Sequence, residues 1–280
     1  MREIKVIRLI FRNFFMLFYY LWHFDTNINR KTFVAKCHKY YFCGMDLTLF
    51  LEHGADYFLP NLSIDLVIIG YEGNELKCLL LQIGDKWLLP GGYIAREEAV
   101  VDAAARILKD RTGLENPHLK FLAVFGDSHR NFAGEWRDFL EKSGLPWSED
   151  SWLNARFVSL AYYSLVDIKK TFPVVSNLDT DFRWFDFDDL PDMWMDHRAI
   201  VLEARNRLKE DIKHEEITYK LLPEQFTMPE LHQLHEAILE TKLDRSRFQK
   251  KMLATGMFER LPKKQQESPG SNPYAYRVVS

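Results

Sequence analysis

Apolar and polar residues in the first two thirds of the chain alternate in short runs that predict β-strands. The runs LSIDLVIIGY (62–71) and LKCLLLQIG (76–84) flank the turn-like EGNE (72–75), a pattern typical of a β-hairpin. Further strands are expected at FLAVFG (121–126), within RFVSLAYYSLV (156–166) and within RWFDFDDLP (183–191). Alternation along a strand predicts that one of the neighbours Tyr162 and Tyr163 lies in the core.

Two segments have the spacing of amphipathic helices. The first follows the turn at Gly91-Gly92, and Gly113 stands where such a helix would end. Its apolar positions are Val100, Ala103, Ala104, Ile107 and Leu108. The second, HRAIVLEARNRLKEDI (197–212), repeats apolar residues every four positions on one side. Strands interleaved with helices predict a layered α/β sandwich.

The last 70 residues have a different pattern. Thr227 followed by Glu230, with Pro229 in the first turn, is a capping box that predicts the start of a helix. The expected core positions of that helix are Leu231, Leu234, Ala237 and Ile238. After the short turn TKL (241–243), Asp244 is a favourable N-cap for a second helix.

This second helix is expected to turn Phe248, Met252 and Leu253 inward and to end at Gly256. The segments MFERL (257–261) and YAYRVV (274–279) then predict two strands around a loop. Helix, turn, basic helix and β-hairpin together are typical of a winged helix-turn-helix.

The N-terminal segment divides the chain into an extension, residues 1–44, and two predicted domains, 45–212 and 213–280. Its uncharged apolar run Phe14–Trp22 has nine residues, against the roughly 20 that span a bilayer. It imitates a signal peptide without a small-residue cleavage site. The favoured interpretation is a mis-called start, with Met45 as the true one, and the alternative is a membrane tether.

Charge is distributed unevenly along a chain whose net charge is −3. Between Lys242 and Lys264, eight Lys or Arg stand against Asp244 and Glu259, so this segment carries +6 and the remainder −9. Such an asymmetry favours contact with a polyanion, while a solvated helix face is the alternative. The cysteines at 37, 43 and 78 form no CxxC pair, which favours a reducing, cytoplasmic setting.

Residues 91–114, GGYIAREEAVVDAAARILKDRTGL, resemble the Nudix box of a hydrolase family, whose signature is G-x5-E-x7-R-E-U-x-E-E-x-G-U. The positions on this spacing are Gly92, Glu98, Arg106, Leu108, Gly113 and Leu114. The carboxylates that hold Mg²⁺ in that family are replaced, because Ile107 follows the arginine and the paired glutamates are Asp110 and Arg111.

An isoleucine offers no oxygen ligand, and an arginine repels a divalent ion. No catalytic residue, metal ligand or cofactor is therefore expected. The alternative is a divergent hydrolase that uses Glu97, Glu98 or Asp102 as substitute ligands.

The chain from about residue 56 to 280 also resembles the Nudix-related transcriptional regulators, in which a Nudix-like effector domain precedes a C-terminal winged helix. The segments that carry the likeness include YFLPNLSIDLVIIGY, WLLPGGYI, FGDSHR, MDHRAI and LLPEQFTMPELHQLHEAIL with KLDRSRFQKKML. One departure is that about two dozen residues, 131–154, separate FGDSHR from the next strand. This stretch is expected to be a long loop or a helical insertion.

The resemblance implies an α+β fold: a Nudix-like α/β/α sandwich with a mixed sheet, followed by a winged helix-turn-helix domain. It also implies a homodimer that binds double-stranded operator DNA and senses an ADP-ribose-like nucleotide or a sugar. The expected location is cytoplasmic, without membrane association. The alternative is an active Nudix hydrolase of ADP-ribose or a sugar nucleotide with an accessory C-terminal domain.

Candidate effector contacts lie in the loop after the 121–126 strand and in the degenerate box. An aspartate suits sugar hydroxyls and an arginine suits a phosphate. The expected contacts are Asp127, Arg130, Arg156, Glu98 and Arg106. The alternatives are ordinary loop residues and, for Glu98 with Arg106, a salt bridge that shapes the loop. Asp196 and His197 are interpreted chiefly as a helix cap.

Candidate DNA contacts lie on the basic helix and on the wing. The helix would present cations and a polar side chain to phosphates and base edges: Arg245, Arg247, Gln249, Lys250 and Lys251. Lys263 and Lys264 on the wing would contact backbone phosphates, which position a protein without reading sequence.

Overall fold

The computed structural model describes residues 47–114, 118–175, 178–263 and 273–279, all within the unit Met45–Ser280. The predictions for the 1–44 extension, for Lys264 and for the side chain of Lys263 fall outside the described part. Among the helices that are described, none is long and apolar enough to span a membrane.

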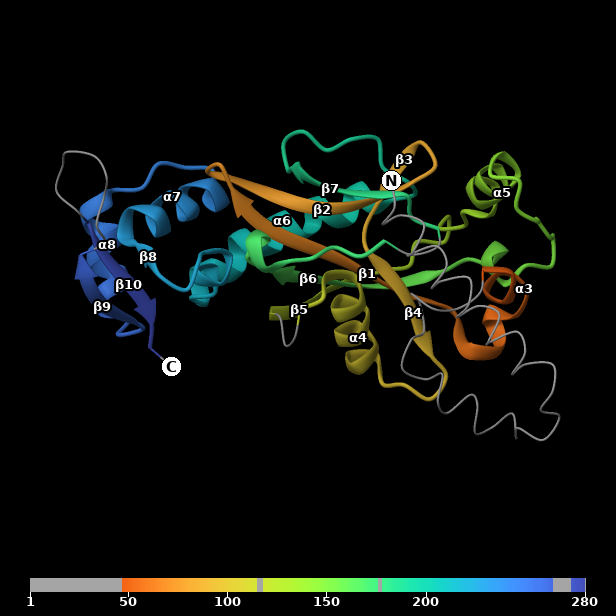
Figure 1. The fold of residues 1–280 in the computed structure, drawn as a ribbon, viewed down its shortest axis with the longest axis horizontal. Coiled ribbons are helices and arrows are strands. Elements are labelled where there is room, and N and C mark those ends of the chain that lie inside the picture. Colours follow the sequence, from red (N-terminus) through yellow and green to blue (C-terminus); the bar gives the residue numbers. More distant parts are fainter. Residues whose placement is uncertain (1–46, 115–117, 176–177, 264–272, 280) are drawn as a thin grey trace, which may run out of the picture. The chain divides into compact units, whose positions relative to one another are not determined.

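One mixed sheet organises the chain up to residue 186 (Figure 1). Its central strand β1 (Phe58–Glu72) pairs in parallel with β6 (Val158–Leu165) and antiparallel with β2 (Glu75–Ile83) and β4 (Gly91–Ala95). The remaining strands are β3 (Lys86–Leu88), β5 (His118–Phe125) and β7 (Asp181–Asp186). The β1–β2 hairpin, whose ends meet at Glu72 and Glu75, confirms the expected turn.

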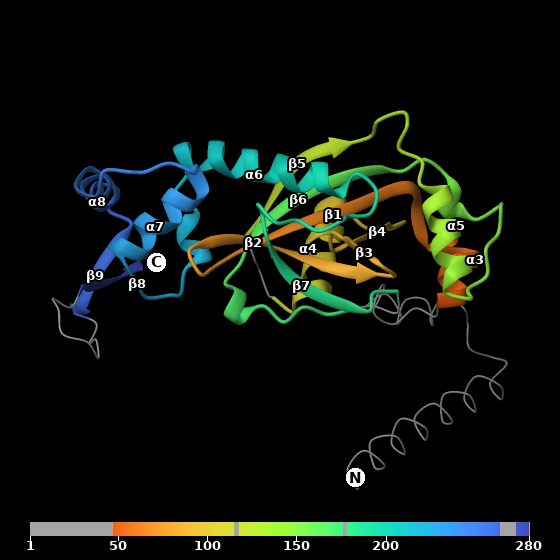
Figure 2. The same ribbon diagram turned by 90° about the horizontal axis from the view of Figure 1, so that it is seen from above.

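Both faces of this sheet are covered by helices (Figure 2). α4 (Val100–Thr112) packs on one face through Ala103, Ala104, Ile107 and Leu108. α6 (His197–His214) packs on the other. Tyr162 and Tyr163 therefore enter opposite cores and both are buried, whereas alternation alone predicted burial of one.

The stretch 131–154 contains two helices, α5 (Ala133–Lys142) and the 3-10 turn η1 (Trp152–Asn154). Trp136 packs against Trp194 with a ring separation of 4.8 Å. Trp152 packs against Tyr93 of β4 and against Phe50 of α3 (Leu47–Tyr57). The insertion is thus anchored to the sandwich by aromatic contacts.

The C-terminal part forms the expected winged helix-turn-helix. Its elements are the 3-10 turn η3 (Thr218–Leu221), β8 (Phe226–Thr227), α7 (Met228–Leu239), α8 (Arg245–Ala254), β9 (Phe258–Lys263) and β10 (Tyr274–Val278). The capping box of Thr227 and Glu230 is formed, and Asp244 accepts a hydrogen bond from the Arg247 N–H. Both predicted helix starts are confirmed.

The prediction that Leu253 points inward is wrong, because its side chain is 42% exposed. Successive residues of a helix are rotated by about 100°. Leu253 therefore lies roughly 140° around the helix from Phe248, while Met252 lies only about 40° away. Phe248 and Met252 alone form the buried stripe of α8.

The apolar core on the α6 side continues from the sheet into the helix-turn-helix. Val67 and Ile69 of β1 belong to the same buried cluster as Leu221, Leu234 and Met252. The winged helix is consequently packed against the sandwich through shared apolar contacts.

Candidate functional site

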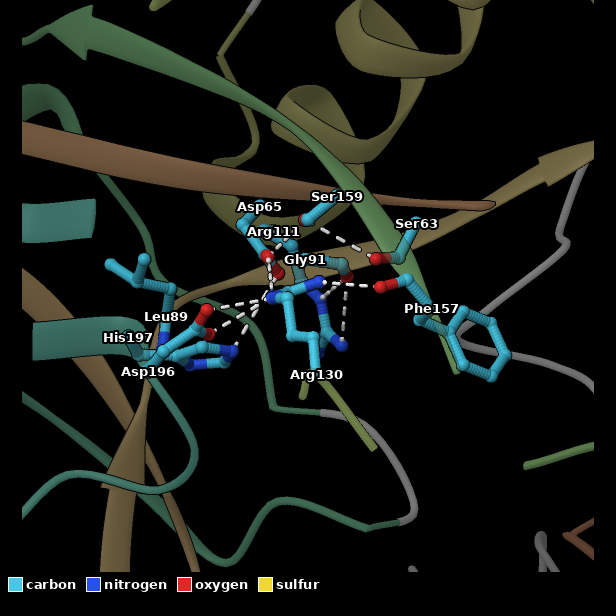
Figure 3. Close-up of polar contacts among 10 residues, drawn as sticks. All are labelled: Ser63, Asp65, Leu89, Gly91, Arg111, Arg130, Phe157, Ser159, Asp196 and His197. Atoms are coloured by element: carbon cyan, nitrogen blue, oxygen red, sulfur yellow. Dashed lines mark hydrogen bonds and ion pairs between the residues drawn. The ribbon is translucent and has the colours of Figure 1, made fainter. Parts of the chain in front are cut away.

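A buried polar cluster lies where β1, β4 and β6 meet the first turn of α6 (Figure 3). Its centre is Asp65, which is 7% exposed and precedes the buried apolar residues Leu66–Ile69 of β1. The Asp65 carboxylate accepts a hydrogen bond from the Ser159 hydroxyl, which in turn accepts one from Ser63 at 3.2 Å. A guanidinium nitrogen of Arg130 lies 3.6 Å from the carboxylate, so Asp65 is compensated despite its burial.

Arg130 is 4% exposed, and all three of its guanidinium nitrogens have partners. Its Nε and Nη2 donate to the two carboxylate oxygens of Asp196 at 2.7 and 3.0 Å, while Nη1 donates to the Phe157 carbonyl at 3.2 Å. Asp196 occupies the N-cap position of α6, but its side chain makes no capping hydrogen bond. The expected cap is therefore corrected: this carboxylate neutralises Arg130 instead.

His197 is a buried neutral base beside this pair. Its Nδ1 accepts a hydrogen bond from the Leu89 N–H at 3.0 Å, which places the ring proton on Nε2, 3.8 Å from Asp65. Burial lowers the pKa of His197, although Asp65 and Asp196 oppose the shift. The structure thus gives His197 a hydrogen-bonding role between the β3–β4 connection and α6.

Arg111 occupies the position of the second glutamate of the Nudix pair. Its Nη1 lies 2.6 Å from Asp179 Oδ2, and both side chains are 4% exposed. Its Nε and Nη2 donate to the Gly91 carbonyl at 3.4 Å. A fixed cation, neutralised by Asp179, thus stands at this point of the box. Across the described ranges, no group of three or more His, Cys, Asp or Glu is placed to hold a metal ion.

Glu98 and Arg106 form a bidentate salt bridge, with distances of 2.7 and 2.8 Å. Arg106 also donates to the Tyr93 carbonyl at 3.0 Å, and Glu98 accepts from the Ala95 N–H at 3.2 Å. Arg106 further approaches Asp110 at 3.7 Å, while burial raises the pKa of that carboxyl. These residues of the box therefore tie α4 to the end of β4.

The remaining effector candidates lie on the loop after β5 and on the segment just before β6, which Arg156 links to that loop. Asp127 accepts a hydrogen bond from the His129 N–H at 2.9 Å, and Arg156 donates to the Gly126 carbonyl at 2.8 Å. Asp127, His129 and Arg156 are exposed, whereas Arg130 turns inward from the same loop. The structure brings Asp127, Arg130 and Arg156 together and places Glu98 with Arg106 in a separate set of contacts.

Sequence reasoning missed Asp65, Ser159 and Asp179. An aspartate inside the apolar run LSIDLVIIGY was a usable signal, because a buried carboxylate needs partners. Ser159 and Asp179 gave no comparable signal. Their partners lie 94 and 68 positions away along the chain.

The outer face of α8 carries the second candidate site. Phe248 and Met252 hold the helix against the winged-helix core. Its exposed polar side chains include Arg245, Arg247, Gln249, Lys250 and Lys251. None of these four cations forms an ion pair with another described residue, so their charge is available to an external anion.

Comparisons with known proteins match two parts of the chain. The Nudix domain family matches residues 61–204, more than half of the chain, and the NrtR DNA-binding winged helix family matches residues 218–278. The chain is 24% identical over 214 residues to the ADPR-responsive transcriptional repressor NtrR of Acinetobacter baylyi, covering 73% of this chain and 77% of that protein.

Two solved structures share the fold. The NrtR of Shewanella oneidensis, crystallised with a 27mer DNA, is 23% identical, covers 78% of this chain and 93% of its own, and superimposes with a TM-score of 0.62. A MutT/nudix family protein of Enterococcus faecalis is 20% identical, covers 91% and 95%, and gives 0.57. The chain therefore belongs to the Nudix family and ends in a winged helix of the NrtR type.

Proposed function

We propose that this protein is a DNA-binding transcriptional regulator whose Nudix domain binds an effector without hydrolysing it. The observation that carries the proposal is α8, a helix of an NrtR-type winged helix whose exposed cations have no ion-pair partner among the described residues. Cations placed in this way release condensed counterions when they meet DNA phosphates, which drives association. The A. baylyi relative is named as a repressor, which supports the same role here.

The effector proposed for the Nudix domain is an ADP-ribose-like nucleotide or a sugar. The name of the A. baylyi relative supports ADP-ribose. The exposed loop around Asp127 and Arg156 offers a carboxylate for ribose hydroxyls and a guanidinium for phosphate. Binding would change DNA affinity only if the effector prefers one arrangement of the DNA-binding domains in a homodimer.

We do not propose hydrolysis, because two positions that hold the metal ion in the hydrolase signature are occupied here by a packed apolar side chain and by a fixed cation. Ile107 is 2% exposed, and its side chain lies against Gly92. Arg111 is held by Asp179 and the Gly91 carbonyl. Hard divalent ions require several oxygen ligands, and a neighbouring guanidinium opposes their binding.

The domain division 45–212 and 213–280 remains a proposal. The two family matches lie on either side of it, and α6 crosses it at its last turn, since the helix ends at His214.

The decisive experiment selects DNA from a random pool with the full chain and measures affinity with and without ADP-ribose. We expect selected DNA to bind, and ADP-ribose to change the affinity. A parallel assay with Mg²⁺ and ADP-ribose should release no AMP above background. If the protein binds no DNA, the proposed role as a transcriptional regulator is wrong. Turnover of ADP-ribose on the order of 1 per second or faster would show that the protein is an active hydrolase.

A further inference from the structure

The turn between α7 and α8 is closed by a residue in an unusual conformation. Glu240, at the end of α7, has φ 52° and ψ 37°, in the left-handed region. Glycine normally takes this place at a helix end because a side chain there is sterically disfavoured. A strained residue of this kind is a reason to ask what its side chain provides.

The Glu240 carboxylate bridges the turn to α6. Arg205 Nη2 lies 2.5 Å from its Oε1, and Lys209 Nζ lies 2.6 Å from its Oε2. Arg205 and Lys209 are four residues apart and so project from the same side of α6. Arg205 is further fixed by Asp188 at 2.6 Å. One carboxylate of the helix-turn-helix is therefore held by two cations of the sandwich.

The first turn of α6 is held by the polar cluster. Asp196 binds Arg130, the buried member of the loop that carries the candidate effector residues, and His197 binds the Leu89 N–H. Between its ends α6 packs on the sheet through Ala204 and Leu208. The same rigid helix thus contacts the effector loop at one point and the turn before α8 at another.

We propose that Glu240 is a positioning residue for DNA recognition: its ion pairs with Arg205 and Lys209 fix α8 relative to α6, and the Arg130–Asp196 pair links that helix to the effector loop. The inference rests on the proposed function. An effector that binds the loop shifts Arg130 with it, and the Arg130–Asp196 pair carries that shift to the first turn of α6. That change is passed to the turn before α8 through Glu240.

The matched variants are Glu240→Gln and Glu259→Gln. Both remove one carboxylate from the winged helix, and the two side chains are 43% and 48% exposed. Glu259 pairs with Arg277 on the neighbouring strand and has no bond to α6. Loss of a negative charge by itself strengthens binding to DNA. Weaker binding in Glu240→Gln alone is therefore a positional effect.

We expect Glu240→Gln to lower DNA affinity roughly threefold to tenfold. This change corresponds to about the free energy that one exposed ion pair contributes. The slope of affinity against salt should stay unchanged, because no phosphate contact is lost. The response to ADP-ribose should weaken in Glu240→Gln and in Asp196→Asn, and persist in Glu259→Gln. The double variant Lys209→Gln with Glu240→Gln should bind DNA no more weakly than Glu240→Gln alone.

A second measurement does not depend on DNA. Spin labels at Leu202 of α6 and Leu253 of α8, both exposed, report the distance between the helices in a chain with Cys37→Ser and Cys43→Ser. The distance distribution should be narrow in the parent chain and in Glu259→Gln and broad in Glu240→Gln. An unchanged distribution in Glu240→Gln overturns the proposal. If the parent chain binds no DNA, the proposed function fails, while this distance still decides the role of Glu240.

Discussion

The arginines of the Nudix domain and those of α8 are the same residue type in opposite situations. Arg111 and Arg130 are 3% and 4% exposed, and each is locked to an aspartate at 2.6 to 2.7 Å. Arg245 and Arg247 are exposed and have no ion pair to any residue in the described part of the chain. A buried cation stabilises the fold through its partner, whereas an exposed one keeps its charge for an outside anion.

This difference separates cations that are neutralised within the fold from cations whose charge is exposed. Sequence position does not distinguish them, because Arg130 and Arg156 both flank the same loop, yet only Arg156 is exposed. Substitution of a locked cation should change stability, and substitution of a free one should change DNA affinity.

The largest effect is expected for Arg111→Ala. Removing the guanidinium breaks a buried ion pair with Asp179, so the free energy of unfolding should fall by roughly 3–5 kcal/mol. Urea denaturation followed by circular dichroism measures this loss. Arg277→Ala is the control, because its pair with Glu259 is about half exposed and contributes about 1 kcal/mol or less. Equal losses of stability in both variants would show that the buried and the exposed ion pair do not differ in their contribution to the fold.

A similar loss is expected on acidification, through His235 beneath α8. This ring is 4% exposed, contacts Phe248 at 4.9 Å and shares a hydrogen bond with Thr218 at 2.8 Å. Burial lowers its pKa to about 4, with Lys251 and His232 adding to the shift. The unfolded chain, with a pKa near 6.5, then binds more protons between pH 6.5 and 4.

The contribution of His235 to the free energy of unfolding should therefore be fully present above pH 6.5. It should fall by roughly 3 kcal/mol as the pH drops to about 4. His235→Gln keeps a hydrogen-bonding group near Thr218 but does not titrate, so its stability should lose this part of the pH dependence. Denaturation curves at pH 7.5, 5.5 and 4.5 for both proteins test the sign. Identical pH profiles would show that His235 is protonated without cost in the folded state.

An intermediate effect is expected for the free arginines of α8. Arg245→Ala or Arg247→Ala should weaken binding to the selected DNA by roughly 1–3 kcal/mol if the side chain contacts a base, and leave the free energy of unfolding nearly unchanged. Fluorescence anisotropy and urea denaturation measure the two quantities on the same preparations. Lost stability without lost affinity would identify these residues as structural.

The smallest effect is expected for the wing. Lys263→Ala or Lys264→Ala should weaken all DNA sequences about equally and lower the slope of affinity against salt by about one unit. A sequence-dependent loss would instead mean that the wing reads bases. If the wing and α8 variants behave alike, α8 is not the recognition helix.

Local signals in the sequence sufficed for most of the fold. The capping box at Thr227, the Asp244 cap and the β1–β2 turn all depend on residues within four positions of one another, and all three are formed. The basic face of α8 followed from helical spacing for the same reason. Leu253 shows the limit, since its place on the helix surface depends on which stripe meets the core.

The sequence by itself predicted most of the helices and strands and showed which residue types stand at the positions of the Nudix box, because these depend on near neighbours and on residue type. Only the tertiary structure decided which charges are free. Arg130 meets Asp196, 66 positions away, Arg111 meets Asp179, 68 away, and Glu240 meets Arg205 across two helices. The free energy of a charge depends on burial and on its partner, and both are set when distant segments pack together.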